Sequence, residues 1–318
     1  MATEKVKVLY IAGSSRSGST ILGNVLGQID GFFHVGELFH IWQRGFVENW
    51  RCGCGSLFRE CDIWKATTDK VFGGIDKVDA EKILSLLKGF PRTRHIPLLL
   101  IPGTSILLKR RLREYLNSIE QLYKDLHHII GYKVIVDSSK SPAYLWALSI
   151  LPNIDLYTIH LIRHPQGYAF SYMRKRPYPS GIDTGKYMMN QHPIKSALVW
   201  LFENAGIELL CHRQRYMRVY YEDFIMQPRD TLINILNFVE ERNRDLSFVN
   251  NQTVKLNSCH TISGNPVRFK VGEIKLHLDT EWLYNMPFKY KFLVYLLTWP
   301  LLLKYSYHSS RGYKCSSC

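Results

Sequence analysis

The residues with the clearest chemical meaning lie in a loop rich in glycine and serine near the start of the chain. Gly13 and Gly18 are separated by four residues and followed by Ser19 and Thr20, which matches G-x-x-x-x-G-K-[ST] except that Ser19 replaces the lysine. Glycines let the backbone curl so that successive N–H groups point at one anion, and a helix N-terminus adds positive potential. The loop therefore predicts a phosphate-type ligand, with Arg16 as the nearby cation. A strand-to-helix turn without a ligand is the alternative.

The same loop carries a resemblance to a known family. The run Arg16-Ser17-Gly18-Ser19-Thr20 after a hydrophobic strand resembles the 5′-phosphosulfate loop of sulfotransferases, which use 3′-phosphoadenosine 5′-phosphosulfate (PAPS). That family usually has Lys or Arg followed by Ser-Gly-Thr at this place. The chain looks closest to the broad bacterial-type sulfotransferases. The resemblance implies a P-loop-like fold, a nucleotide-binding site for PAPS and adenosine 3′,5′-bisphosphate as the product.

Two further segments extend the resemblance to the other end of the nucleotide. In the family, an Arg at a strand end and a Ser eight residues later bind the 3′-phosphate, and Arg163 and Ser171 have that separation. The planar guanidinium of Arg163 suits a phosphate. Arg268 follows a turn signal at residues 264–266 and corresponds more weakly to a C-terminal loop that closes the cofactor site. An exposed Arg on a surface turn is the alternative for Arg268, and a solvated basic helix is the alternative for residues 174–176.

The resemblance also implies catalytic residues. Gly36-Glu37 looks like the Gly-Glu pair that supplies a catalytic glutamate in tyrosylprotein and several bacterial sulfotransferases, so Glu37 is the candidate general base. Its apolar neighbours would raise the pKa of a buried carboxyl toward a useful range. Lys140 in DSSK and Arg16 in the loop are the cations that would neutralise the departing phosphate. The alternatives are a bracing salt bridge for Glu37, His34 or His40 as the base, and pairing of Lys140 with a neighbouring Asp.

The cysteines form a separate pattern. Cys52, Cys54 and Cys61 cluster as C-x-C followed by a third thiol, and Cys315 and Cys318 lie at the end of the sequence. Three thiols lack the fourth ligand of a closed zinc site unless the tail or a histidine supplies it. In a cytosolic protein, reduced and packed thiols are favoured over a disulfide. We therefore expect no metal.

Composition and charge limit the possible functions. The 318 residues include 41 Lys and Arg against 27 Asp and Glu, a net charge of +14, so an anionic partner is expected. It could be a nucleotide, an acidic glycan, nucleic acid or a membrane surface. The N-terminus lacks a signal-peptide apolar region, which predicts a cytoplasmic protein. The apolar segment 292–303 is too short to span a membrane, and we expect it to dock on the core, with peripheral membrane contact as the alternative.

Elements that position these residues alternate along the chain. Apolar runs at 6–12, 132–136, 154–162 and 216–221 are each followed by a helical pattern. This alternation predicts an α/β fold of three layers, a central mainly parallel sheet flanked by helices, with ligands beyond the carboxyl ends of the strands. We expect a single domain over residues 1–318, in which residues 32–131 form a large insertion near the acceptor.

The resulting hypothesis is a cytoplasmic, PAPS-dependent sulfotransferase that moves a sulfonate group in line to a hydroxyl or amine of a small-molecule or glycan acceptor. A P-loop metabolite kinase is the rival enzyme, although its phosphate-binding Lys is missing. A basic protein that binds nucleic acid or a membrane is the rival from another class. Nucleic acid is not the expected partner. The sequence does not specify the acceptor or the oligomeric state.

Overall fold

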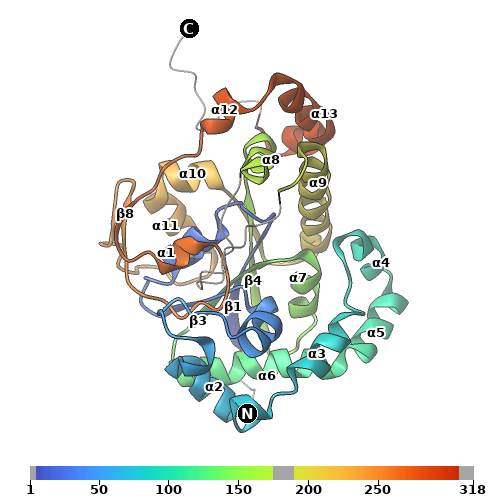
Figure 1. The fold of residues 1–318 in the computed structure, drawn as a ribbon, viewed down its shortest axis with the longest axis vertical. Helices are drawn as coiled ribbons and strands as arrows, with labels where there is room; N and C mark the ends of the chain where they lie inside the picture. Colours follow the sequence, from blue (N-terminus) through green and yellow to red (C-terminus); the bar gives the residue numbers. More distant parts are fainter. Residues whose placement is uncertain (1–4, 175–189, 308–318) are drawn as a thin grey trace.

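The computed structural model describes residues 5–174 and 190–307, and its centre is a parallel sheet of five strands in the order β2-β3-β1-β4-β5. Helices cover both faces of this sheet (Figure 1). The predicted three-layer α/β fold is thus confirmed. The strands are β1 (Val6–Gly13), β2 (Phe32–Gly36), β3 (Val134–Lys140), β4 (Ile154–Ile162) and β5 (Tyr216–Tyr220).

The central strand β1 is buried on both faces, as its continuous apolar run predicts. Val8 and Tyr10 pack in one hydrophobic core, whereas Leu9 and Ile11 pack in the other, because successive side chains of a strand point to opposite faces. Each fully buried aliphatic side chain of this kind stabilises the fold by about 1.5–3 kcal/mol. The first core is covered by α6 (Arg113–Ile130) and α7 (Pro142–Ser149), the second by α1 (Ser19–Leu26), α10 (Tyr221–Met226) and α11 (Pro228–Phe238).

Strand β2 differs from the sequence-based prediction, which assigned residues 32–131 to an insertion. Phe32 pairs with Val134 and Phe33 with Ile135, so this segment begins as an edge strand of the central sheet. Its residues are buried on both sides, and a short run of that kind carries no alternation by which to recognise a strand.

After β2, a short π-helical segment at Ile41–Val47 leads into the helices of the insertion. The helical segment over residues 102–130 is broken at Leu112, which is buried and leaves helical geometry. The helices here are α2 (Asp62–Phe72), α3 (Ala80–Leu87), α4 (Ile96–Leu99) and α5 (Pro102–Arg111). All of α5 stays at the surface, while α6 buries its apolar face.

A small antiparallel sheet was not predicted. Its strands are β6 (Val249–Asn250), β7 (Thr253–Leu256) and β8 (Gly272–Lys275), in the order β6-β7-β8. Between β7 and β8 the chain crosses to the central sheet, where the Ile262 N–H donates to the Val35 carbonyl. This crossing brings residues 257–268 to the carboxyl end of β2.

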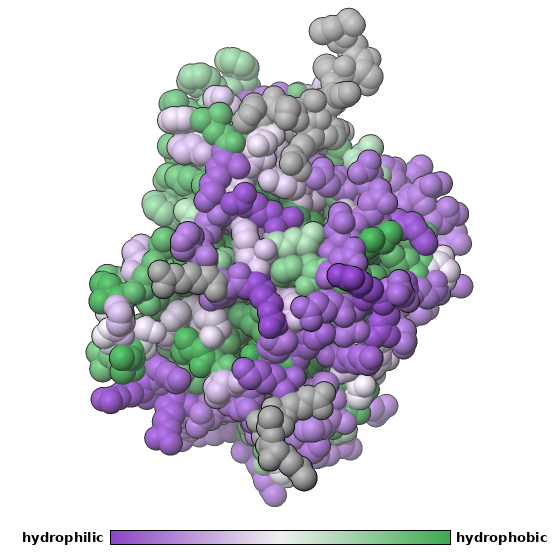
Figure 2. Space-filling model, turned by 180° about the vertical axis from the view of Figure 1, so that it is seen from behind, coloured by the Kyte–Doolittle hydropathy of each residue, from purple (hydrophilic) through white to green (hydrophobic). Residues whose placement is uncertain are grey.

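The last described helix, α13, is less buried than the prediction of a core helix requires. It packs on α9, beside α8 and α12, at the top of Figure 1. Only Val294, Thr298 and Leu302 are buried, whereas large apolar side chains such as Phe288 are exposed. Hydrophobic surface gathers on this side of the molecule (upper left in Figure 2). The helices are α8 (Pro165–Met173), α9 (Pro193–Leu210), α12 (Glu281–Asn285) and α13 (Phe288–Lys304).

Among the described residues, no helix combines the length and the apolar character needed to cross a membrane.

Candidate active site

The glycine-rich loop connects β1 to α1 as predicted, and its backbone takes the strained form that an anion-binding loop needs. Gly18 has φ 92°, and a Cβ there would lie 2.6 Å from Cδ2 of Tyr221, so only glycine fits. Arg16 also has positive φ, at 64°. No side chain caps the first turn of α1, which leaves its N–H groups for a ligand. Ser17 Oγ is buried and has no hydrogen-bond partner among the described residues.

A cavity of about 600 Å³ opens beside this loop, at the carboxyl ends of the central strands. This is the position where ligands bind in parallel α/β folds. One wall belongs to the segment that follows β7: the Asn265 N–H donates to Thr20 Oγ1 at 3.1 Å. Positive side chains prevail in the lining, whose charged residues are Arg16, Arg44, Lys140, Arg163, Lys270 and Lys275 against Glu37, Glu203 and Asp279.

Glu37 and Lys140 meet in this cavity although they are 103 residues apart in the chain. The Lys140 ammonium donates to Glu37 Oε1, and Arg44 Nη1 donates to Oε2 at 2.9 Å. Ser263 Oγ donates to the same Oε2 at 3.1 Å. The strand ends bring the two together: Glu37 directly follows β2, and Lys140 ends the adjacent β3 with a φ of 70°.

The pKa of Glu37 differs in direction from the expectation. Burial by itself raises the pKa of this carboxyl, but Lys140, His40 and Arg44 outweigh burial and hold the pKa well below its usual range. The expected rise considered only the apolar neighbours, and the sequence does not reveal that two cations, Lys140 and Arg44, pair with the group. The carboxylate is therefore ionised at neutral pH and able to accept a proton, with Lys140 as its present partner.

The two histidines considered as alternative bases, His34 and His40, have different surroundings. His34 is buried away from the cavity lining, with its ring nitrogens 3.1 Å from Asn24 Oδ1 and 3.0 Å from Ser138 Oγ. Burial lowers the pKa of His34 to about 3, so the ring is neutral and structural. His40 does line the cavity, with Nε2 3.8 Å from Glu37 Oε2.

Arg163 reaches the loop from the end of β4. Its Nη1 donates to the Arg16 carbonyl at 2.8 Å, and its Nη2 donates to Asp279 Oδ2 at 2.8 Å. The guanidinium also stacks on the Tyr221 ring, 4.7 Å from its centre. The structure therefore brings the two predicted nucleotide-binding regions into contact on one side of the molecule.

Three predicted ligands, Ser17, Ser171 and Arg268, are absent from the lining of the cavity, and the last two are held by other contacts. Ser171 is fully buried and donates to the Tyr168 carbonyl of its own helix at 2.7 Å. Arg268 is buried and donates to the carbonyls of Thr261 and Arg51 at 2.7 and 2.6 Å. In this geometry both have structural contacts instead of facing a nucleotide. Lys175, one of the basic residues at 174–176, lies outside the described residues, as do Cys315 and Cys318.

Glu203 on α9 is a cavity residue that the sequence analysis missed. Its Oε2 is buried without a hydrogen-bond partner among the described residues, and desolvation raises the pKa of the carboxyl to about 7. The available signal was a carboxylate within the apolar run SALVWLFENAGIELL, which contains Glu203 and Glu208, because such a residue must face either solvent or polar partners.

The chain shares its architecture with two solved sulfotransferase domains. The domain of the Synechococcus PCC 7002 olefin synthase superposes with a TM-score of 0.52 and 18% identity, covering 94% of this chain and 95% of that domain. The domain from the curacin biosynthetic pathway gives a TM-score of 0.53 and 17% identity, over 94% of this chain and 98% of that domain. No protein-family model matches. No curated protein matches significantly.

This chain has a sulfotransferase fold. The likeness covers nearly the whole length of both domains. At these identities the likeness concerns the fold. Function has to be argued from the site.

Proposed function

We propose that the protein is a PAPS-dependent sulfotransferase that transfers a sulfonate group to a hydroxyl or amine of a small-molecule or carbohydrate acceptor. The observation that carries the proposal is a single cavity lined by the loop after β1, by Arg163 and by the pair of Glu37 and Lys140. The sulfotransferase fold supports it. Ser19 in place of the P-loop lysine argues against a metabolite kinase.

The donors of the cavity suit a nucleotide with phosphate groups at both ends. The amides of the loop and of the first turn of α1, together with Arg16 and Ser17 Oγ, would hold the 5′-phosphosulfate. Arg163 would hold the 3′-phosphate in exchange for Asp279, its present anionic partner. The cations converge on a cavity, which suits a small anion better than nucleic acid, whose phosphates need an open basic surface.

PAPS supplies an activated sulfonate on a phosphate leaving group, and its product is adenosine 3′,5′-bisphosphate. We assign Glu37 as the general base that accepts the proton of the acceptor hydroxyl or amine. Lys140 and Arg16 hold positive charge where the leaving phosphate becomes more negative. Because Lys140 pairs with Glu37 in the structure, a bound polyanion competes for the ammonium, and loss of that partner raises the pKa of Glu37 toward the range of an effective base.

Calorimetry separates this proposal from its rivals. We expect adenosine 3′,5′-bisphosphate to bind without a divalent cation and ATP with Mg²⁺ to bind much more weakly. Arg163→Ala should lose about ten- to a hundredfold in affinity, since a hydrogen bond to a charged group contributes about 1.5–3 kcal/mol. Arg110→Ala, which removes an exposed arginine on α5, is the matched control. Preference for ATP with Mg²⁺ would refute the proposal.

Turnover is tested with purified protein, PAPS and a panel of hydroxyl and amine acceptors, read by mass spectrometry as the gain of one sulfonate. Aromatic and basic side chains around the insertion, such as Trp50 stacked on Arg44, favour aromatic or acidic acceptors. If the protein binds the nucleotide but transfers sulfonate to no acceptor, the proposed transferase activity is refuted and only the proposed nucleotide binding is supported.

We also propose that the protein acts in the cytoplasm and touches membranes peripherally through α13. Exposed apolar side chains lie along this helix and lysines lie near both of its ends, a composition typical of helices that lie at a lipid interface. The exposed members are Phe288, Phe292, Tyr295, Leu296, Trp299 and Leu303, next to Lys289 and Lys291.

A further inference from the structure

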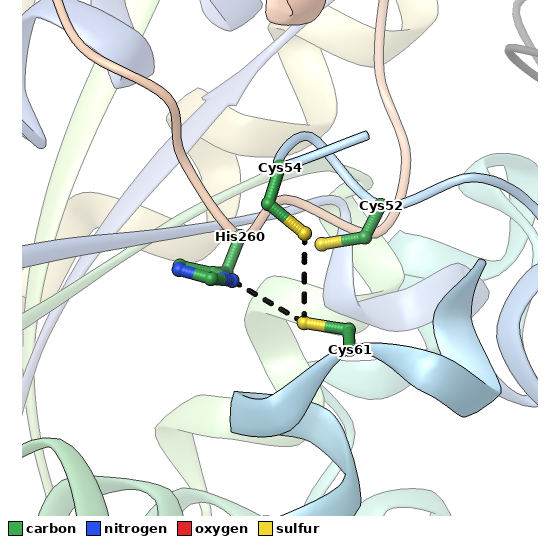
Figure 3. Close-up of side chains that lie close together, drawn as sticks. All are labelled: Cys52, Cys54, Cys61 and His260. Atoms are coloured by element: carbon green, nitrogen blue, oxygen red, sulfur yellow. Dashed lines mark hydrogen bonds between the residues drawn. The ribbon is translucent and has the colours of Figure 1, made fainter. Parts of the chain in front are cut away.

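Three cysteines and one histidine that the proposed reaction does not use converge behind the wall of the cavity. Cys52, Cys54 and Cys61 come from the insertion, and His260 comes from the segment between β7 and β8 (Figure 3). Their four ligand atoms all lie within 4.8 Å of one another. We propose that these residues form a structural zinc site with three thiolates and one imidazole. From the sequence no metal is expected because a fourth donor is missing, and in the structure His260 supplies that donor.

Distances within the cluster fit a tetrahedral ion. Zinc bonds of about 2.3 Å to sulfur and about 2.0 Å to nitrogen place two sulfurs about 3.8 Å apart, and a sulfur and a nitrogen about 3.5 Å apart. Cys54 Sγ and Cys61 Sγ are 3.8 Å apart. Cys61 Sγ and His260 Nδ1 are 3.2 Å apart, so a shift of a few tenths of an ångström completes the geometry. Figure 3 shows the four side chains pointing toward one another.

The backbone around the cysteines is already shaped for this arrangement. The Cys52 N–H donates to the Ser56 carbonyl at 2.7 Å, and the Gly55 N–H donates to the Cys52 carbonyl at 2.9 Å, which closes a tight turn. The Gly53 N–H donates to the Thr261 carbonyl at 2.9 Å. A Cβ at Gly53 would lie 2.6 Å from Thr261 Oγ1, so this glycine permits the close approach of the two segments.

Outer contacts hold the histidine in place. The His260 carbonyl accepts a hydrogen bond from Trp64 Nε1 at 2.8 Å, and its ring stacks on Phe33. Arg268 bridges the carbonyls of Thr261 and Arg51, the neighbours of His260 and Cys52 in the chain. Such outer contacts fix the ligands of metal sites. The buried position of Arg268, which does not suit nucleotide binding, is accounted for by this bracing role.

The donor set selects the ion and its role. Three soft thiolates with one imidazole favour zinc over hard cations such as Mg²⁺ or Ca²⁺. Four protein donors leave no open position for a substrate, which makes the site structural. When zinc binds, the thiols release their protons to solvent and three zinc–sulfur bonds and one zinc–nitrogen bond form, without oxidation or reduction.

The cluster would fasten the wall that carries Glu37. His260 lies three residues before Ser263, whose hydroxyl donates to Glu37 Oε2. The Ile262 N–H between them donates to the Val35 carbonyl of β2. Zinc would therefore join the insertion to the segment that holds the candidate base. Because a structural metal contributes its binding free energy to folding, its loss should loosen this wall.

Metal analysis of the full chain tests the proposal independently of activity. We expect protein purified without a metal-binding tag from zinc-supplemented cells to contain one zinc per chain by inductively coupled plasma mass spectrometry. His260→Ala and Cys61→Ser should contain almost none. Cys211→Ser removes a buried thiol outside the cluster and should keep the metal.

A cobalt experiment on the wild-type chain keeps the proposal testable if the cluster variants do not fold. After removal of zinc with a chelator, added Co²⁺ should give the intense visible absorption of a tetrahedral ion and a thiolate-to-cobalt charge-transfer band. Added zinc should abolish both signals. Protein with no bound zinc and no such cobalt spectrum would overturn the proposal, as would mass-mapping of a stable disulfide between Cys54 and Cys61 in the isolated protein.

Discussion

Replacement of Glu203 by glutamine should stabilise the protein at alkaline pH and have much less effect at acidic pH. Desolvation raises the pKa of this carboxyl from 4.5 to about 7, so the folded state binds its proton more tightly than the unfolded state. Between these two pH values the folded chain carries more bound protons, and the free energy of unfolding falls as the pH rises. A shift of this size corresponds to about 3 kcal/mol above pH 7. Glutamine has no charge to bury and escapes that penalty.

The assay is urea denaturation of both proteins at about pH 5 and about pH 8, followed by circular dichroism. We expect the difference in unfolding free energy between Glu203→Gln and wild type to move in favour of the variant by about 2–3 kcal/mol across this range. Glu81→Gln, which neutralises an exposed carboxylate on α3, should show no such change. An equal difference at both pH values would refute the reasoning that burial in the cavity keeps Glu203 protonated.

Three further perturbations test other parts of the site. Glu37→Gln should lower kcat by about 10²–10⁴-fold while calorimetry finds an affinity for adenosine 3′,5′-bisphosphate that is equal to or higher than that of wild type, because Lys140 loses a competing anion. Gly18→Ala should lower the melting temperature and weaken nucleotide binding, because its Cβ meets Tyr221 and its φ is positive, at a cost of about 1–3 kcal/mol. The double change Phe288→Ser and Trp299→Ser should reduce co-sedimentation with anionic vesicles and leave nucleotide affinity unchanged.

Each of these experiments has a contradicting outcome. Normal turnover by the Glu37→Gln protein would remove this carboxylate from the reaction. A Gly18→Ala protein that melts and binds like wild type would show that the loop does not need its observed backbone conformation. Vesicle binding that is equal with and without the two aromatic side chains, or absent in wild type, would end the assignment of α13 as a lipid-contacting surface.

The parts of the site predictable from sequence are those encoded by neighbouring residues. The loop from Gly13 to Thr20 is contiguous, and its glycine spacing by itself specifies a strand, a tight turn and a helix. The position of Lys140 at the cavity was also foreseeable, because it closely follows a predicted strand and parallel strands end at one edge of the sheet, whereas the strand that carries Glu37 to the same edge was not predicted.

Contacts between distant segments were beyond the reach of sequence reasoning. The spacing between Arg163 and Ser171 suggests that both can face one phosphate. It does not show whether the Ser171 hydroxyl instead donates to a carbonyl of its own helix, as it does here. No residue near His260 in the sequence indicates that its ring contacts Cys61, which lies 199 residues earlier in the chain. The predicted direction of the Glu37 pKa shift was wrong for the same reason, because the shift depends on charged side chains from other elements.

The cavity wall joins parts of the chain that are synthesised at very different times. The Asn265 amide contacts Thr20 across 245 residues, and Ser263 contacts Glu37 across 226. A nascent chain on the ribosome can thus form much of the central sheet while its cavity still lacks one side. Loops of this length close slowly. Fragments that end before residue 257 lack this wall, and we expect them to bind no nucleotide in the cavity.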